Sequence, residues 1–124
     1  NCLLTNERLV RINIFIDHAG MRPFIDAQIV SEEAGCGKPD DEFFRLGLNR
    51  LGVEGKDCVH FGDNEITDGA CKDLGMKFVL VEGYKNPECT WGRGNKIYEP
   101  DARIDRLTPE SMQQVLRELE NRNN

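Results

Sequence analysis

Short apolar runs alternate with longer amphipathic segments along most of the chain. The apolar runs predict β-strands at residues 2–4, 27–30, 57–63, 77–83 and 102–105. The longer segments predict helices at residues 6–19, 38–52, 65–75 and 108–120. Residues 84–100 have no clear period and contain two glycines and two prolines, so they predict a long loop. Strands that alternate with helices in this way predict an α/β domain with right-handed crossovers and a parallel sheet.

Four polar residues follow the predicted strands or sit where a loop enters a helix. Thr5, Ser31 and Asp63 come after the first, second and third strands, and Lys38 stands at a loop-to-helix boundary. Ligands of parallel sheets bind at the carboxyl ends of the strands. We therefore expect these side chains to converge on one edge of the sheet.

The stretch "HFGDNEITDGACKDLGM" places Asp63 directly after the third strand and Asp68 five positions later. Gly62 would allow a tight turn or a close approach of the backbone to a ligand. Two neighbouring carboxylates repel unless a cation lies between them, and Mg²⁺ accepts one or two carboxylates together with water and phosphate oxygens. The alternative is structural, because an acidic residue at a helix start is also stabilised by the helix dipole.

Lys38 lies between Gly37 and Pro39, and Thr5 is followed by Asn6 at a predicted helix start. A lysine at the sheet edge can neutralise a phosphoryl group as a point charge. A threonine hydroxyl and the amides of a helix start can bind phosphate oxygens. Taken alone, each residue also fits a simpler role, Lys38 as a solvated surface charge and Thr5 as the neighbour of a helix cap.

Composition narrows the class of protein. The 124 residues are 39% hydrophobic and 31% charged with a net charge of -6, which predicts one soluble globular domain and argues against nucleic-acid binding. The sequence has no apolar run long enough for a membrane span.

The spacing of the five cysteines fits neither a zinc site nor a disulfide framework, so we expect reduced thiols and a cytoplasmic protein. The opening "NCLLTNE" is not a signal peptide and starts inside a strand, which predicts a fragment of a longer chain.

Three segments occur in the order that characterises a known superfamily. The segments "CLLTN", "SEEAGCGKPDDEFF" and "VHFGDNEITDGACKDLGMKFVLV" resemble the second, third and fourth motifs of the haloacid dehalogenase-like (HAD) hydrolases, in particular the phosphatase branch. The resemblance covers residues 2 to 82, and "DARIDRLTPESMQQVL" is similar to the usual last strand and helix. It implies a Rossmann-like three-layer α/β/α fold with a parallel sheet.

The resemblance also implies roles for the candidate residues. Thr5 would bind phosphoryl oxygens with help from Asn6, and Lys38 would stabilise the nucleophile and the transferring phosphoryl group. Asp63 would hold Mg²⁺, with Asp68 either as a second ligand or as a supporting residue, and Asn64 would help to position the site. The implied reaction is hydrolysis of a small phosphorylated metabolite through an aspartyl-phosphate.

One departure from the family is decisive for these expectations. The first motif of the family, Asp-x-Asp, supplies the nucleophile and the general acid/base, and no Asp-x-Asp occurs in the 124 residues. The cap domain that follows it is also missing. Residues 1–124 are therefore expected to be the C-terminal part of a core domain that lacks its central first strand, between the strands that end at Thr5 and Asp63. Such a fragment should be inactive alone and should need its missing N-terminal segment or associate with itself.

Other functions remain open at this stage. A haloacid dehalogenase or a phosphomutase would share the same motifs, although the pair of Asp63 and Asp68 indicates a metal, which a dehalogenase does not need. A non-catalytic binding or regulatory domain with the HAD-like fold is favoured by the missing Asp-x-Asp, provided that the chain is complete.

Overall fold

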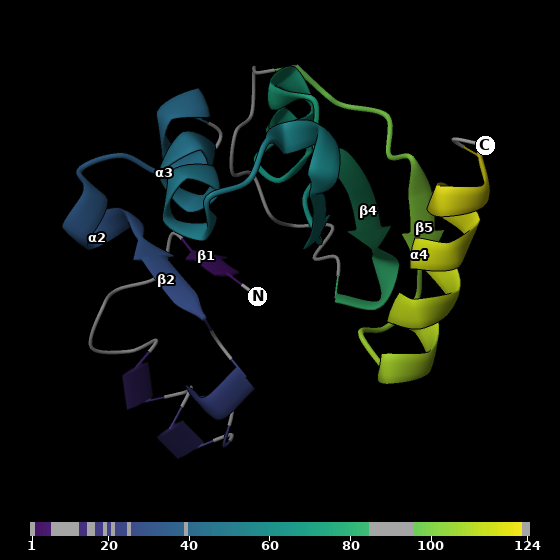
Figure 1. Cartoon of the computed structure of the whole chain (residues 1–124), viewed down its shortest axis with the longest axis horizontal. Coiled ribbons are helices and arrows are strands. Elements are labelled where there is room, and N and C mark those ends of the chain that lie inside the picture. Colours follow the sequence, from purple (N-terminus) through teal and green to yellow (C-terminus); the bar gives the residue numbers. More distant parts are fainter. Residues whose placement is uncertain are drawn as a thin grey trace.

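All strands of the computed structural model are paired in parallel. The model describes residues 2–5, 13–14, 17–18, 20, 22–24, 26–38, 40–84 and 96–122. Strands β1 (Cys2–Thr5) and β2 (Ala27–Val30) form a two-stranded sheet. Strands β3 (Val59–Gly62), β4 (Lys77–Val81) and β5 (Ala102–Ile104) form a second sheet in that order (Figure 1). The predicted parallel α/β fold is confirmed.

The helices agree less closely with the sequence prediction than the strands do. Helices α3 (Asp41–Leu51) and α4 (Pro109–Arg122) lie where amphipathic segments predict them. The expected helix at 65–75 is instead a 3-10 helix, η3 (Gly69–Leu74), and a short helix α2 (Ser31–Ala34), which we did not predict, follows β2. Three further 3-10 turns are η1 (Arg22–Phe24), η2 (Gly55–Asp57) and η4 (Glu82–Tyr84). The expected helix at 6–19 and the predicted loop at 84–100 lie largely outside the described residues.

The two sheets do not pair with each other in the part of the chain that the structure describes. Strand β1 pairs there only with β2, and strand β3 pairs only with β4. The second edge of β1 and the second edge of β3 therefore have no strand partner in the described residues. Helix α3 joins the halves because it packs on β1 and β2 and also on η3 (Figure 1). The approach of α3 to β1 is close, since a Cβ atom added to Gly47 would lie 3.0 Å from a methyl group of Leu4.

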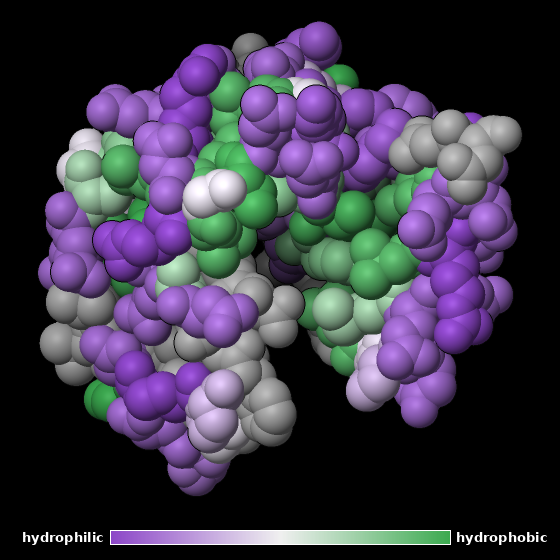
Figure 2. All heavy atoms as spheres, viewed as in Figure 1, coloured by the Kyte–Doolittle hydropathy of each residue, from purple (hydrophilic) through white to green (hydrophobic). Residues whose placement is uncertain are grey.

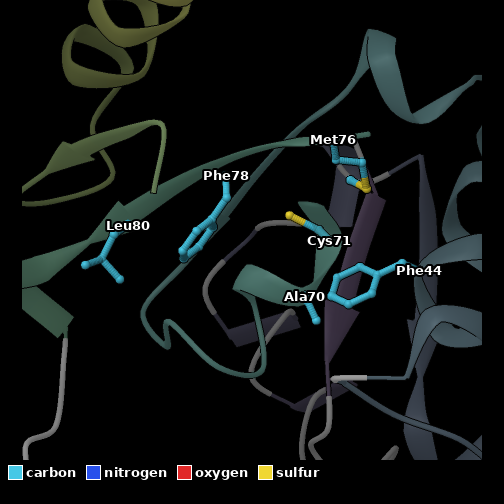
Figure 3. Close-up of a cluster of buried hydrophobic side chains, with 6 residues drawn as sticks. All are labelled: Phe44, Ala70, Cys71, Met76, Phe78 and Leu80. Atoms are coloured by element: carbon cyan, nitrogen blue, oxygen red, sulfur yellow. The ribbon is translucent and has the colours of Figure 1, made fainter. Parts of the chain in front are cut away.

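Strand β4 supplies the centre of the core to both faces of its sheet. Phe78 and Leu80 face α3 and η3 in a buried cluster with Phe44, Ala70, Cys71 and Met76 (Figure 3). Val79 faces the opposite side and packs against Val115 and Leu119 of α4. Because consecutive strand residues point to opposite faces, this alternation places helices on both sides of the sheet and gives the expected three-layer α/β/α arrangement.

The start of helix α4 is better capped than its sequence indicates. Thr108 Oγ1 accepts a hydrogen bond from the Ser111 amide at 3.1 Å, and the Thr108 amide donates to Ser111 Oγ at 3.0 Å. We expected an incomplete capping box, because Ser111 stands where a glutamate or glutamine usually completes it. That expectation was wrong, since the serine hydroxyl makes the reciprocal bond.

None of the helices in the described ranges is both long and apolar enough to cross a membrane.

Two leucines of α4 provide a test of the packing on β4. Leu119 is 5% exposed and belongs to the cluster around Val79, whereas Leu116 on the same helix is 40% exposed. Leu119→Ala should lower the free energy of unfolding by about 2–4 kcal/mol, because it leaves a cavity in the core. Leu116→Ala is the matched control and should change it by less than about 0.5 kcal/mol. Urea unfolding followed by circular dichroism measures both, and equal effects would contradict this packing.

Candidate functional site

The carboxylate of Asp68 is the centre of a buried polar cluster at the carboxyl end of β3. Its Oδ1 atom accepts hydrogen bonds from Lys38 Nζ at 2.6 Å and from His60 Nε2 at 2.9 Å. Its Oδ2 atom accepts a hydrogen bond from the backbone amide of Asn64 at 3.2 Å. The Asp68 side chain is only 4% exposed, so these donors replace water around the carboxylate.

These partners keep Asp68 ionised. Burial alone raises the pKa of Asp68, but the hydrogen bond from His60 and the positive charge of Lys38 outweigh it and hold the pKa well below its ordinary value. An ionised carboxylate can only accept hydrogen bonds, so the shared hydrogen resides on His60 Nε2. In this cluster the Asp68 carboxylate therefore accepts hydrogen bonds from one cationic donor, Lys38 Nζ, and from two N–H groups, those of the His60 ring and the Asn64 backbone.

Gly62 is required by the position of Asp68. A Cβ atom at residue 62 would lie 2.2 Å from Asp68 Cγ, which no packing tolerates. The backbone of Gly62 has no positive φ, unlike Gly35, Gly52 and Gly75, so conformational freedom does not explain this glycine. Of the two explanations that the sequence offers, close approach is the correct one, and the group that approaches is a side chain of the same protein.

Asn64 shapes the turn that carries Asp68. Its Oδ1 atom accepts hydrogen bonds from the amides of Ile66 and Thr67, both at 2.9 Å, and its carbonyl oxygen accepts from the Asp68 amide at 3.0 Å. Asp68 precedes η3 but its side chain makes no capping bond. The expectation that Asp68 also caps the following helix was wrong, because both of its oxygens already accept hydrogen bonds from Lys38, His60 and Asn64.

The structure brings together some of the predicted site residues. Lys38, Asn64 and Asp68 meet in one cluster, although they come from two separate segments of the chain. Asp63 follows β3 directly and its side chain is exposed. Thr5 is the last residue of β1, where it pairs with Val30, and Asn6 lies outside the described residues.

The two aspartates differ in their fitness for a metal ion. Asp68 already accepts three hydrogen bonds, including one from a cation, so its position suits a supporting residue. Asp63 offers an exposed carboxylate at the strand end, which is the kind of oxygen ligand that Mg²⁺ takes. Within the described ranges, no three histidine, cysteine or acidic residues gather in a way that could hold a metal ion. Asp63 would therefore be one ligand of a site that needs further oxygen atoms.

His60 is the cluster member that sequence reasoning missed. It lies in β3 between Val59 and Phe61, which both pack toward α4, so its ring faces the other side of the sheet. There the ring meets Phe44 edge to face, with centroids 5.4 Å apart. The signal available in the sequence was a polar residue within an apolar predicted strand, because such a side chain, once buried, needs a hydrogen-bond partner inside the protein.

Comparisons with known proteins agree on one family for this chain. A model of the haloacid dehalogenase-like hydrolases matches residues 2–75. The chain is 41% identical over 85 residues to a glyceraldehyde 3-phosphate phosphatase of Methanocaldococcus jannaschii. The aligned region covers 66% of this chain and 34% of the relative. A glyceraldehyde 3-phosphate phosphatase of Methanopyrus kandleri is 31% identical over 115 residues, 91% of this chain and 44% of the relative. The chain thus spans less than half the length of these two relatives.

The fold has solved counterparts as well. The crystal structure of the HAD-hydrolase YfnB from Bacillus subtilis, bound to magnesium, superimposes with a TM-score of 0.76 at 19% identity. The superposition covers 94% of this chain and 47% of that one. At this identity the likeness concerns the fold alone.

The contact between Gly62 and Asp68 can be tested by a double-mutant cycle. Gly62→Ala should lower the free energy of unfolding by about 1–3 kcal/mol, because its Cβ forces the carboxylate group aside. In an Asp68→Gly background the Cβ and the carboxylate that obstruct it are both absent, so the same Gly62 substitution should cost clearly less. Urea unfolding of the four proteins measures the difference. An equal cost in both backgrounds would show that Gly62 serves another purpose.

Proposed function

Because the chain belongs to the haloacid dehalogenase-like hydrolase family, we propose that it is part of the catalytic core of a Mg²⁺-dependent phosphatase that acts on a small phosphorylated metabolite. The observation that carries the proposal is the buried ion pair of Lys38 with Asp68, beside Asp63 at the carboxyl end of β3. Two relatives named as phosphatases support the same reaction class.

The proposed roles follow from charge and position. Lys38 offers a fixed ammonium group to the phosphoryl oxygens, and Asp68 holds that group in place by accepting its hydrogen bond at 2.6 Å. Thr5, at the end of β1, and Asn6 offer a hydroxyl group and amides to the same oxygens. The net charge of the chain is -6, so attraction of a phosphate ester depends on local cations, which are Lys38 and, when it is bound, Mg²⁺.

Asp63 is proposed as the protein ligand for Mg²⁺ because it is exposed at the strand end, while Asp68 and Asn64 support the loop behind it. When bound, Mg²⁺ supplies positive charge against the oxygens of the transferring phosphoryl group.

The nucleophile is proposed to come from an Asp-x-Asp segment that these 124 residues do not contain. An aspartate oxygen of that segment attacks phosphorus, the P–O bond to the substrate alcohol breaks, and the second aspartate protonates the leaving oxygen. Water then attacks the aspartyl-phosphate, releases inorganic phosphate and restores the carboxylate. Residues 1–124 alone should therefore not hydrolyse a phosphate ester.

The proposed place for that segment is between β1 and β3. All four residues of β3 are only half-buried, whereas Phe78 to Val81 of the neighbouring strand β4 are fully buried. Figure 2 shows a hollow between the two halves of the molecule with hydrophobic surface on its walls. A parallel strand in this position would pair with both half-sheets and would bring its carboxyl end beside Thr5 and Asp63.

A non-catalytic binding or regulatory domain is the second candidate, and the lack of Asp-x-Asp in these residues favours it. The discriminating observation is turnover by the full-length protein that the cell makes. A dehalogenase or phosphomutase would share the fold, but the exposed carboxylate of Asp63 favours a metal-dependent reaction.

The metal role of Asp63 can be tested in the full-length protein. Hydrolysis of p-nitrophenyl phosphate should require Mg²⁺ and should fall about 100-fold or more in Asp63→Ala. Asp57→Ala is the matched control, because Asp57 is also exposed but precedes β3 and therefore lies at its opposite end. Steady-state kinetics across a Mg²⁺ titration measure both variants. Full activity in Asp63→Ala would remove the metal role.

The half-sheet arrangement predicts how the isolated chain behaves. Residues 1–124 alone should be poorly stable or should self-associate, because β1 and β3 each have one edge whose backbone amides and carbonyls lack a strand partner in the described residues. Size-exclusion chromatography and urea unfolding of residues 1–124 check this, with the full-length protein as the reference. A monomeric chain that unfolds cooperatively at high urea would contradict the proposed strand position.

A further inference from the structure

We propose that His60 is a positioning residue, which holds the carboxylate of Asp68 in the orientation that fixes the ammonium group of Lys38 at the sheet edge. This inference rests on the proposed function of Lys38 as the group that meets the phosphoryl oxygens. It adds a residue that neither the motif pattern nor the sequence analysis assigned to the site.

His60 and Lys38 share one acceptor atom. His60 Nε2 and Lys38 Nζ both donate to Oδ1 of Asp68, at 2.9 and 2.6 Å. The terminal torsion of an aspartate is broad, so a carboxylate held by few bonds can rotate. With His60 on Oδ1 and the Asn64 amide on Oδ2, both oxygens are fixed, and the place of Lys38 is then determined.

The two donors to Asp68 differ in rigidity. His60 belongs to β3, pairs with Phe78 of β4 and touches the buried ring of Phe44. Lys38 reaches Asp68 from the loop that follows α2, on a flexible four-carbon side chain. The rigid donor therefore sets the carboxylate, and the flexible donor adjusts to it.

Packing alone does not explain why residue 60 is a histidine. The His60 side chain is only 12% exposed and lies against Phe44, so an apolar side chain of similar size would fill the position. The distinctive property of histidine here is a directed N–H group on a stiff ring, and that group points at Asp68 Oδ1. Lys38 follows β2 and His60 lies in β3, so the carboxylate of Asp68 that both donors share links the two halves of the molecule.

Activity of the full-length protein provides the first readout. His60→Leu should lower kcat for p-nitrophenyl phosphate about 10-fold or more while KM changes little, because loss of a supporting hydrogen bond typically costs 10- to 100-fold. His60→Gln should recover much of the rate, since its amide nitrogen can donate to Asp68 from nearly the same position. Phe44→Leu is the control that loses the ring contact and keeps the hydrogen bond. It should reduce stability and leave the kcat of the folded enzyme close to that of the wild type.

The reactivity of Lys38 provides a readout that needs no turnover. The rate of acylation of Lys38 by an amine reagent, followed by mass spectrometry, should rise several-fold in His60→Leu and stay near the wild-type rate in His60→Gln. Lys56 is the internal reference, because its side chain is 75% exposed and lies before β3.

The possible outcomes separate the two proposals. A folded His60→Leu protein with wild-type kcat and wild-type Lys38 labelling would overturn the role of His60 and leave the phosphatase proposal standing. A wild-type protein without phosphatase activity would overturn the proposed function, and the labelling of Lys38 would then decide the positioning role by itself. Equal loss of kcat in His60→Leu and Phe44→Leu would mean that His60 only packs.

Discussion

The buried carboxylate of Asp68 is the interaction on which the arrangement of the site depends. A charge in this position is costly unless it is paired and hydrogen-bonded, and here Lys38, His60 and the Asn64 amide provide both. The same carboxylate accounts for the glycine at the end of β3, because any Cβ at Gly62 would collide with it. One ionised side chain thus constrains the strand end, the turn after it and the loop that carries the lysine.

This constraint also connects the two half-sheets. Strand β1 pairs with β2, and β3 pairs with β4, without a pairing between the halves in the described residues. Helix α3 and the contact of Lys38 with Asp68 cross from one half to the other. Because a strand edge offers unpaired amides and carbonyls, a further parallel strand between the halves would satisfy both edges and complete a single sheet. The polar cluster lies at the end of the sheet where the end of such a strand would arrive.

The fold followed from local pattern wherever the pattern was strong. The apolar run of β4 and the amphipathic helices α3 and α4 were predicted close to their observed bounds. The segment before β4 was predicted as a helix over 65–75 but forms the shorter 3-10 helix η3, and Gly69 at its start lies too close to Tyr98 to carry a side chain. A Cβ atom there would meet Tyr98 Cβ at 2.7 Å, a contact that no window of neighbouring residues could show.

The sequence by itself supplied the residue types of the proposed site and predicted that they gather at one edge of the sheet, because the carboxyl ends of parallel strands share one edge. The tertiary structure decided how they are used. It paired Asp68 with Lys38, which stands 30 positions away, and it recruited His60 from the strand interior. It left Asp63 exposed and buried Asp68, for which the sequence had left open the roles of second metal ligand and supporting residue. Burial and hydrogen-bond geometry are properties of the packed chain, and residue spacing alone does not contain them.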